Sequence, residues 1–160
     1  MLQRNEVAEK AKEILENLLE MSGIEATVMV SAEVLPAEQG GESPVALDIK
    51  GEDLGILIGR RGQTLSSLQY IVRLVTAHQT GLYIPIIVDV EGYRKRRDAA
   101  LRALALSIAE QVEAKQVPFK MEPMPPYERR IVHLALANHP HVSTSSIGEG
   151  ELRRVVISLK

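Results

Sequence analysis

The chain of 160 residues contains no cysteine, no tryptophan and few aromatic residues of any kind. The absence of cysteine excludes disulfide bonds and thiolate metal sites, and it fits a reducing compartment such as the cytoplasm. Phenylalanine, tryptophan and tyrosine together make up 3% of the chain. This scarcity argues against an RNP-type sheet, which stacks bases on aromatic rings.

Long apolar runs are missing as well. No uninterrupted apolar stretch approaches the roughly 20 residues that a membrane-spanning helix needs. The N-terminal segment alternates charged and apolar side chains, unlike a signal peptide. We therefore expect a cytoplasmic protein that is not embedded in a membrane.

Charge is distributed unevenly along the chain, although the net formal charge is only -2. Residues 1–52 carry 4 basic and 11 acidic side chains, a net charge of -7, whereas residues 53–160 carry 15 basic and 10 acidic ones, a net charge of +5. This asymmetry favours an anionic partner for the second segment. An uneven solvated surface would give the same counts and remains the alternative.

The first part of the chain predicts the order helix, strand, strand, helix, helix, strand. Asn5 is expected to cap the first helix, which Ser22 and Gly23 end. Strands are expected at 25–35, 45–51 and 82–90, with a loop at 36–44, a short helix at 52–58 and a longer helix from 63 to 78. The apolar stripe of the longer helix is Leu65, Leu68, Ile71, Val72 and Val75. Pro85 indicates that the last strand lies at a sheet edge.

The second part predicts the order helix, strand, helix, strand, strand. A long helix within 91–117 would bury Leu101, Leu104, Ala105, Ile108 and Val112. A short extended stretch at 118–126, a helix at 127–139 and a hairpin of strands 141–147 and 152–159 follow. We therefore expect an α+β protein of two small domains, 1–91 and 92–160.

The loop Gly59-Arg60-Arg61-Gly62, which we call the GRRG loop, predicts an anion-binding site. Glycine permits positive φ and lets a ligand approach the backbone closely. The helix that follows begins with unpaired amide groups, and the two arginines supply planar donors that match phosphate. This combination suits a phosphodiester backbone more than it suits base reading. A helix–helix turn with solvated arginines is the alternative, and a P-loop is excluded because no Gly-Lys-Ser/Thr follows.

Arg129 and His133, four residues apart on one predicted helix, form a second candidate site. At about 100° per residue, the opposite face of this helix would be buried. That expected core face is Tyr127, Ile131, Leu134, Ala135 and Asn138. An outward arginine and imidazole can bind phosphate by hydrogen bonding or, when the imidazole is protonated, by charge. Two solvated side chains with the same spacing remain the alternative.

A basic cluster at the start of the long helix comprises Arg94, Lys95, Arg96, Arg97 and Arg102. Cations in a first helical turn oppose the helix dipole, which favours a functional reason for them. We expect Arg94 and Arg97 to bind nucleic-acid phosphates, although each member could equally be a solvated charge.

Three hydroxyl residues, Thr144 to Ser146, are expected near Arg129 and could also contact phosphates. Arg153 and Arg154 should lie on opposite faces of one strand, so at most one of them would join the same surface. The histidines at 133, 139 and 141 have no carboxylate or cysteine spaced to complete a metal site. With no nucleophile–base pair and no grouped carboxylates either, we expect no metal, no cofactor and no enzymatic activity.

The segment Ile56 to Val75 resembles the Ile-Gly-x-x-Gly core of a KH domain, an RNA-binding module whose loop holds about four nucleotides. The element order is that of the bacterial, type II form. The resemblance implies a three-stranded sheet backed by helices, with single-stranded RNA or DNA lying between the GRRG loop and the sheet edge. Ile56, Ile58 and Leu65 align with the apolar groove or the core of that family.

The segment Pro125 to Leu136, followed by a Ser/Thr-rich stretch and a Gly-Glu-Gly hairpin, resembles the domain named for its Arg-x-x-x-His motif, which binds single-stranded nucleic acid. The succession of a KH domain and this domain is similar to the Jag (SpoIIIJ-associated) family of bacterial RNA-binding proteins. Members often carry a further N-terminal domain and a linker. We expect both to be missing here, and with them any function that rests on them.

The resemblance implies a protein that binds single-stranded RNA, or alternatively single-stranded DNA, as an RNA chaperone or post-transcriptional regulator. The expected binding residues are Gly59, Arg60, Arg61, Gly62, Arg94, Arg97, Arg129 and His133. The alternative is a protein-interaction adaptor, whose partner is a second KH protein or a membrane insertase and whose RNA binding is incidental. The acidic first helix, with Glu9, Glu13, Glu16 and Glu20, would suit such a protein contact.

Overall fold

The computed structural model describes residues 2–32 and 42–160. These form two compact units, Met1–Arg94 and Lys95–Lys160, each of which is described by itself. Both units mix helices and strands, so the predicted α+β class is confirmed. The end of the strand predicted at 25–35 and most of the loop predicted at 36–44 lie outside the described residues.

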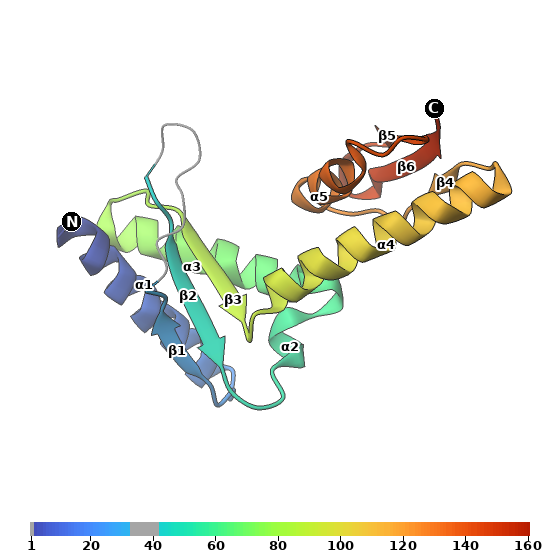
Figure 1. Cartoon of the computed structure of the whole chain (residues 1–160). Coiled ribbons are helices and arrows are strands. Elements are labelled where there is room, and N and C mark those ends of the chain that lie inside the picture. Colours follow the sequence, from blue (N-terminus) through green and yellow to red (C-terminus); the bar gives the residue numbers. More distant parts are fainter. Residues whose placement is uncertain (1, 33–41) are drawn as a thin grey trace. The chain divides into compact units, whose positions relative to one another are not determined.

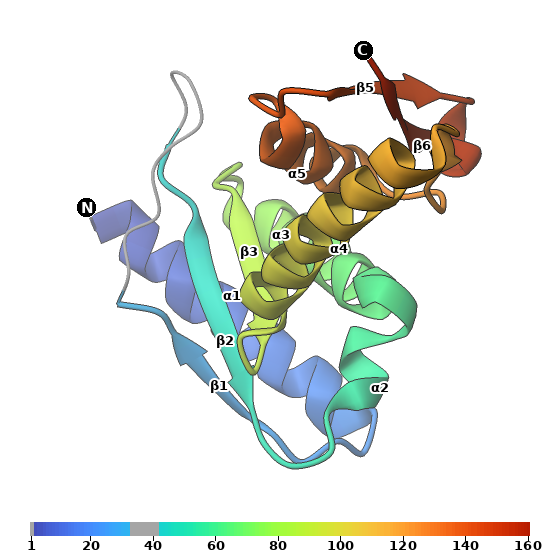
Figure 2. The same ribbon diagram turned by 45° about the vertical axis from the view of Figure 1, so that its right-hand side comes forward.

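The first unit is a three-stranded sheet with two long helices on one face (Figures 1 and 2). Its elements are α1 (Leu2–Met21), β1 (Thr27–Val30), β2 (Val45–Lys50), α2 (Gly55–Ile58), the 3-10 turn η1 (Arg60–Gly62), α3 (Gln63–Thr80) and β3 (Ile86–Val90). The strand order is β1-β2-β3, with β1 antiparallel and β3 parallel to β2. Within the described residues β3 therefore has one open edge, as Pro85 predicted.

Buried and half-buried side chains alternate along β2 and β3 of the first unit, and the buried ones form its core. Leu47 and Ile49 on β2 and Val88 on β3 are fully buried beneath the helices, while the residues between them are half-buried. Leu15 of α1 and Leu65 of α3 close the core from the helical side. Fully burying one such side chain stabilises the fold by about 1.5–3 kcal/mol. The core thus fixes α3, and with it the loop that precedes α3.

Two details of the first unit differ from the prediction. The first helix begins at Leu2, so Asn5 lies inside the helix and is not its cap, whereas the predicted stop at Ser22 and Gly23 is confirmed. On α3, Ile71 is exposed and Thr76 takes the buried position. The buried row of α3 thus runs through Leu65, Val72 and Thr76. The prediction placed this row incorrectly because it considered only the apolar residues of the helix.

The second unit has the predicted order of helix, short strand, helix and two strands. Its elements are α4 (Tyr93–Lys115), which begins at the end of the first unit, β4 (Phe119–Lys120), α5 (Pro126–Leu136), β5 (Val142–Ile147), the 3-10 turn η2 (Gly150–Leu152) and β6 (Arg154–Leu159). The antiparallel sheet has the order β4-β6-β5. Buried side chains from α4, α5 and the sheet form one core.

The predicted core face of α5 was wrong. The buried residues are Glu128, Val132 and Leu136, whereas Leu134 is 66% exposed. The prediction placed the core face of α5 by its apolar residues alone, and these give no indication that a carboxylate is buried. Arg129 and His133 consequently lie half-buried beside β5 and do not point directly away from the core. On α4, Leu104 is exposed, in contrast to the predicted stripe, while Leu101 and Ala105 are buried as predicted.

Candidate nucleic-acid interface

The backbone of the GRRG loop has three residues with positive φ. Gly59 has φ 69° and ψ -173°, a combination that is essentially restricted to glycine, and Gly62 is left-handed with φ 76°. Between them, Arg61 has φ 53°, which is uncommon for a residue with a Cβ atom. A non-glycine residue held in this region costs on the order of 1–3 kcal/mol, and such strain tends to occur at functional sites.

Both the positive φ angles and the close packing around the loop require glycine at positions 59 and 62. A Cβ atom on Gly59 would overlap the side chain of Thr64, approaching its Cβ to 2.7 Å, and one on Gly62 would lie 2.8 Å from Cε1 of Tyr93. Leu57 before the loop and Leu65 after it are both buried in the core. The loop is therefore held on both sides in one conformation.

The loop presents cations at the start of α3. Arg60 is exposed and Arg61 is half-buried, and both lie directly before an 18-residue helix, whose N-terminus carries partial positive charge. Ile56, at 71% exposure, adds an apolar surface on the preceding helix, whereas Ile58 and Leu65 pack in the core. Of the three residues aligned with the KH groove or core, only Ile56 is thus available to a ligand.

Arg94 is half-buried and bonded to the open edge of β3. Its backbone N–H donates to Asp89 (3.1 Å), its Nε donates to the carbonyl oxygen of Val88 (3.1 Å), and its Nη2 donates to Oε1 of Gln69 (2.7 Å). The same Gln69 oxygen accepts the N–H of Val88 at 3.0 Å. Arg94 therefore lies on the sheet edge that the KH resemblance implies as the binding surface.

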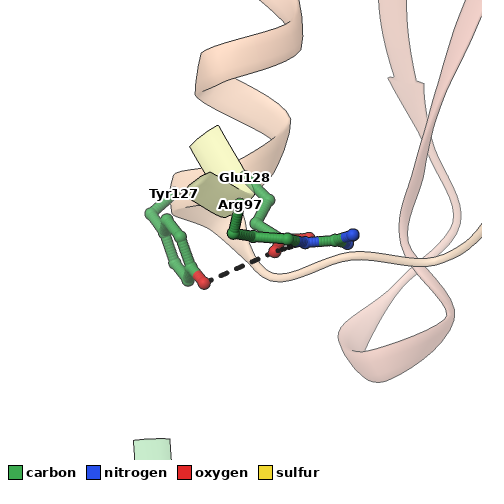
Figure 3. Close-up of polar contacts among 3 residues, drawn as sticks. All are labelled: Arg97, Tyr127 and Glu128. Carbon is green, nitrogen blue, oxygen red and sulfur yellow. Dashed lines mark hydrogen bonds and ion pairs between the residues drawn. The ribbon is translucent and has the colours of Figure 1, made fainter. Parts of the chain in front are cut away.

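Arg97 forms a bidentate ion pair with Glu128 of α5 (Figure 3). Its Nε and Nη2 atoms donate to the two carboxylate oxygens at 2.8 and 3.1 Å, and the hydroxyl of Tyr127 donates to the same carboxylate at 3.4 Å. Glu128 is 0% exposed, and the side chain of Arg97 is 24% exposed. This geometry gives Arg97 a structural contact, whereas the neighbouring Lys95 and Arg96 are exposed.

Arg129 and His133 form a hydrogen-bonded network with two hydroxyls of β5. The ring nitrogens of His133 lie 2.7 Å from Oγ1 of Thr144 and 3.0 Å from Oγ of Ser146. Arg129 donates to the same Ser146 at 3.4 Å and to the carbonyl oxygen of Met124 at 3.3 Å. Thr144 and Ser146 are two residues apart and therefore share the face of β5 that meets α5.

Burial and, to a lesser degree, the cation of Arg129 lower the pKa of His133 from its ordinary value of 6.5. The imidazole is therefore neutral at pH 7, and one ring nitrogen donates while the other accepts. Of the two modes of phosphate binding expected from the sequence, hydrogen bonding through the imidazole and the two hydroxyls agrees with this state. The permanent charge of the site comes from Arg129.

The structure thus groups the predicted residues into separate sites. The GRRG loop and Arg94 belong to the first unit, Arg129 and His133 lie together in the second, and Arg97 is paired with Glu128. Sequence reasoning missed Gln69, Tyr93 and Glu128. One signal in the sequence could have indicated that Arg94 and Arg97 face the core. Both continue the buried row of α4 through Leu101, Ala105 and Ile108, with spacings of three and four residues.

Metal sites and membrane spans are two further features that a sequence of this kind could encode. Across the described ranges 2–32 and 42–160, no group of three or more histidine, cysteine, aspartate or glutamate residues is arranged to hold a metal ion. In the same ranges, no helix combines the length and the apolar character required to cross a bilayer.

Comparison with known proteins assigns both units. A family model for the KH domain of KhpA and KhpB matches residues 9–87, and a model for the Arg-x-x-x-His domain matches residues 99–159. The chain is 43% identical over 152 residues to the RNA-binding protein KhpB of Clostridium symbiosum, covering 95% of this chain and 66% of that protein. It is 42% identical over 125 residues to the RNA-binding protein KhpB of Bacillus subtilis, covering 76% of this chain and 60% of that protein. In both cases it spans less than two thirds of the relative.

Proposed function

Since this chain belongs to the KhpB (Jag) family, in which a KH domain is followed by an Arg-x-x-x-His domain, we propose that it binds single-stranded RNA in the cytoplasm without catalysing a reaction. The KH module is assigned to residues 1–91 and the Arg-x-x-x-His module to residues 92–160. A protein that holds an RNA backbone and does not cleave it can act as an RNA chaperone or as a post-transcriptional regulator.

The conformation of the GRRG loop is the observation that carries this proposal. Gly59 and Gly62 have backbone angles and neighbours that exclude a side chain, so the loop is held in one conformation, in which Gly62 is buried and half-buried Gly59 lets a ligand approach the backbone. Arg60 and Arg61 place positive charge at the same point, ahead of the N-terminus of α3. A flexible turn would need neither two glycines without space for a Cβ atom nor a strained arginine between them.

The Arg-x-x-x-His module supplies a second phosphate site in this proposal. Arg129 provides charge, and the hydroxyls of Thr144 and Ser146 lie against the neutral ring of His133. Hydroxyls both donate and accept, so they can reorient toward a phosphate oxygen while the imidazole keeps the network satisfied. The site is suited to a backbone contact and carries no means of distinguishing bases.

Reversing the charge of the GRRG loop tests the proposal. Arg60→Asp combined with Arg61→Asp places two carboxylates where a phosphate would lie, and aspartate tolerates the left-handed conformation of residue 61. We expect the variant to lose affinity for a short single-stranded RNA while its melting temperature stays nearly constant, because surface charge changes cost within about 0.5 kcal/mol.

A matched control makes the same change in net charge elsewhere. Lys10→Asp combined with Lys12→Asp alters α1, whose surrounding glutamates Glu9, Glu13 and Glu16 repel an RNA backbone. RNA affinity should hardly change in this control. Undiminished RNA binding by the loop variant would contradict the assignment of the GRRG loop as the phosphate-binding site.

Exposed apolar side chains favour the adaptor as a second candidate function. Tyr70 and Leu74 on α3 are each 56% exposed, and Ile71 lies beside them. A row of large apolar side chains on one helix is typical of a protein contact. The partner would be a second KH protein or a membrane insertase. Leu74→Glu should then abolish partner binding and leave RNA affinity intact, as measured by sedimentation with each partner.

A further inference from the structure

The backbone groups at the centre of the open edge of β3 are hydrogen-bonded to side chains. Residues 85 and 91 face β2, because the carbonyl oxygen of Pro85 accepts the N–H of Val45 and the N–H of Glu91 donates to Ile49. Backbone groups alternate in direction along a strand, so those of Val88 point out of the open edge. There the side chain of Gln69 accepts the Val88 N–H and that of Arg94 donates to the Val88 carbonyl oxygen. Two side chains thus replace a neighbouring strand.

This arrangement fixes the guanidinium of Arg94. Three hydrogen bonds of 2.7 to 3.1 Å hold the residue, two of them made by one edge of the guanidinium, Nε and Nη2. An arginine has five N–H donors. Three N–H groups of Arg94 therefore have no partner in the described part of the chain, and two of them, one on Nη1 and one on Nη2, form the remaining edge of the guanidinium. It is a planar pair of donors in a set orientation.

The position of Arg94 relative to the GRRG loop follows from its neighbour. Tyr93 lies so close to Gly62 that a Cβ atom there would be 2.8 Å from the ring, and Arg94 is the next residue. Gln69, which holds Arg94, is seven residues beyond Gly62 on α3, a rise of about 10 Å along the helix. A short nucleic-acid strand whose phosphates contact the loop would therefore have its bases beside this edge.

We propose that Arg94, positioned by Gln69, selects guanine in the RNA bound by the first unit. Guanine presents two adjacent acceptors, O6 and N7, which match the paired donors of an arginine, whereas adenine places a donor beside N7. A base is favoured over a phosphate as the ligand because Arg94 is immobilised on the strand edge, while exposed Arg60 serves the backbone. The inference rests on the proposed RNA binding and adds base preference to it.

Affinities for four heptamers of the form UUUXUUU, with X as G, A, C or U, test the inference. The uniform background lets the RNA slide until X meets Arg94. Guanine should be preferred over adenine and uracil by about fivefold or more, the lower end of what one bidentate base contact provides. Replacing guanine by 7-deazaguanine, which lacks the N7 acceptor, should remove most of this preference.

Arg94→Lys separates base selection from a structural role. A lysine ammonium can contact guanine, but it has no second edge with which to hold Val88 and Gln69 at the same time, so the fixed pair of donors is lost and the guanine-to-adenine affinity ratio should fall toward one. A role limited to stabilising β3 would lower all four affinities together and keep the ratio. Arg73→Lys, the same change at an exposed position of α3, should leave the ratio at the wild-type value.

The outcomes distinguish this inference from the proposed function. If the wild-type protein binds all four heptamers equally, or prefers cytosine, the inference is wrong, whereas RNA binding itself stands so long as reversing the charge of the GRRG loop abolishes it. An unchanged ratio in Arg94→Lys also refutes the assignment to Arg94. If no heptamer binds, both the inference and the proposed function are overturned.

Discussion

Arg97→Met should destabilise the second unit strongly. The substitution keeps a long apolar side chain but removes the guanidinium that pairs with Glu128 through bonds of 2.8 and 3.1 Å. The carboxylate is fully buried, and in the described structure the hydroxyl of Tyr127, at 3.4 Å, would be its remaining side-chain donor. Removing one partner of such a pair costs about 3–5 kcal/mol. For a unit of this size the loss corresponds to a fall in melting temperature of at least about 12 °C.

Amide hydrogen exchange provides the assay, because it reports on each unit of the intact protein. Where exchange requires unfolding of the second unit, peptides from α5 should exchange about 10²- to 10⁴-fold faster in the variant, while peptides from α3 stay unchanged. Arg102→Met is the control: it alters an exposed arginine on the same helix and should stay within about 0.5 kcal/mol of wild type. Combining Arg97→Met with Glu128→Leu should restore most of the stability, since an apolar pair of similar volume replaces the ion pair.

Two results would refute this reasoning. If Arg97→Met exchanges like the wild type and instead loses RNA affinity, Arg97 serves phosphate binding, as the basic cluster in the sequence predicts. If the double variant is no more stable than Arg97→Met, the unpaired carboxylate is not the cause of the loss.

The remaining predictions concern the Arg-x-x-x-His module. Arg129→Ala combined with His133→Ala should leave binding of a tetranucleotide nearly unchanged but remove the gain, on the order of 10²-fold, that appears once an RNA is long enough to reach both modules. Affinity measured against oligonucleotide length checks this, and an equal loss at every length would contradict two sites. His133→Gln should remove part of the acid sensitivity of the fold. Because folding lowers the pKa of His133, the unfolded chain binds the proton at a higher pH than the folded chain does. The contribution of the neutral imidazole to stability is therefore complete above pH 6.5 and is lost as the pH falls below that value. Urea-unfolding curves of both proteins at pH 7.5 and 5.5 measure this effect. The prediction is wrong if the free energy of unfolding changes between the two pH values by the same amount in both proteins.

Local patterns in the sequence predicted most of the architecture. Alternation in 45–51, the strand pattern of 82–90, the helical spacing after Gly62 and the stop at Gly23 each depend on residues within one element, and the observed order follows them. The GRRG loop was also recognisable, because its signal is contained in four consecutive residues and the helix behind them. Periodicity over one or two turns is a local property and needs no knowledge of the partner element.

The sequence by itself thus determined the element order, the position of the glycine loop and the Arg129–His133 pair. Only the tertiary structure decided which cations are held in place by other elements. Arg94 and Arg97 look like the exposed Lys95 in a list of basic residues, but they meet Gln69 and Glu128, which come from elements far away in the chain. A charge can be buried only where a distant partner satisfies it, and hydropathy along one helix carries no information about that partner. The same reason explains why Glu128, a charged residue, lies in the core while Leu134 is exposed.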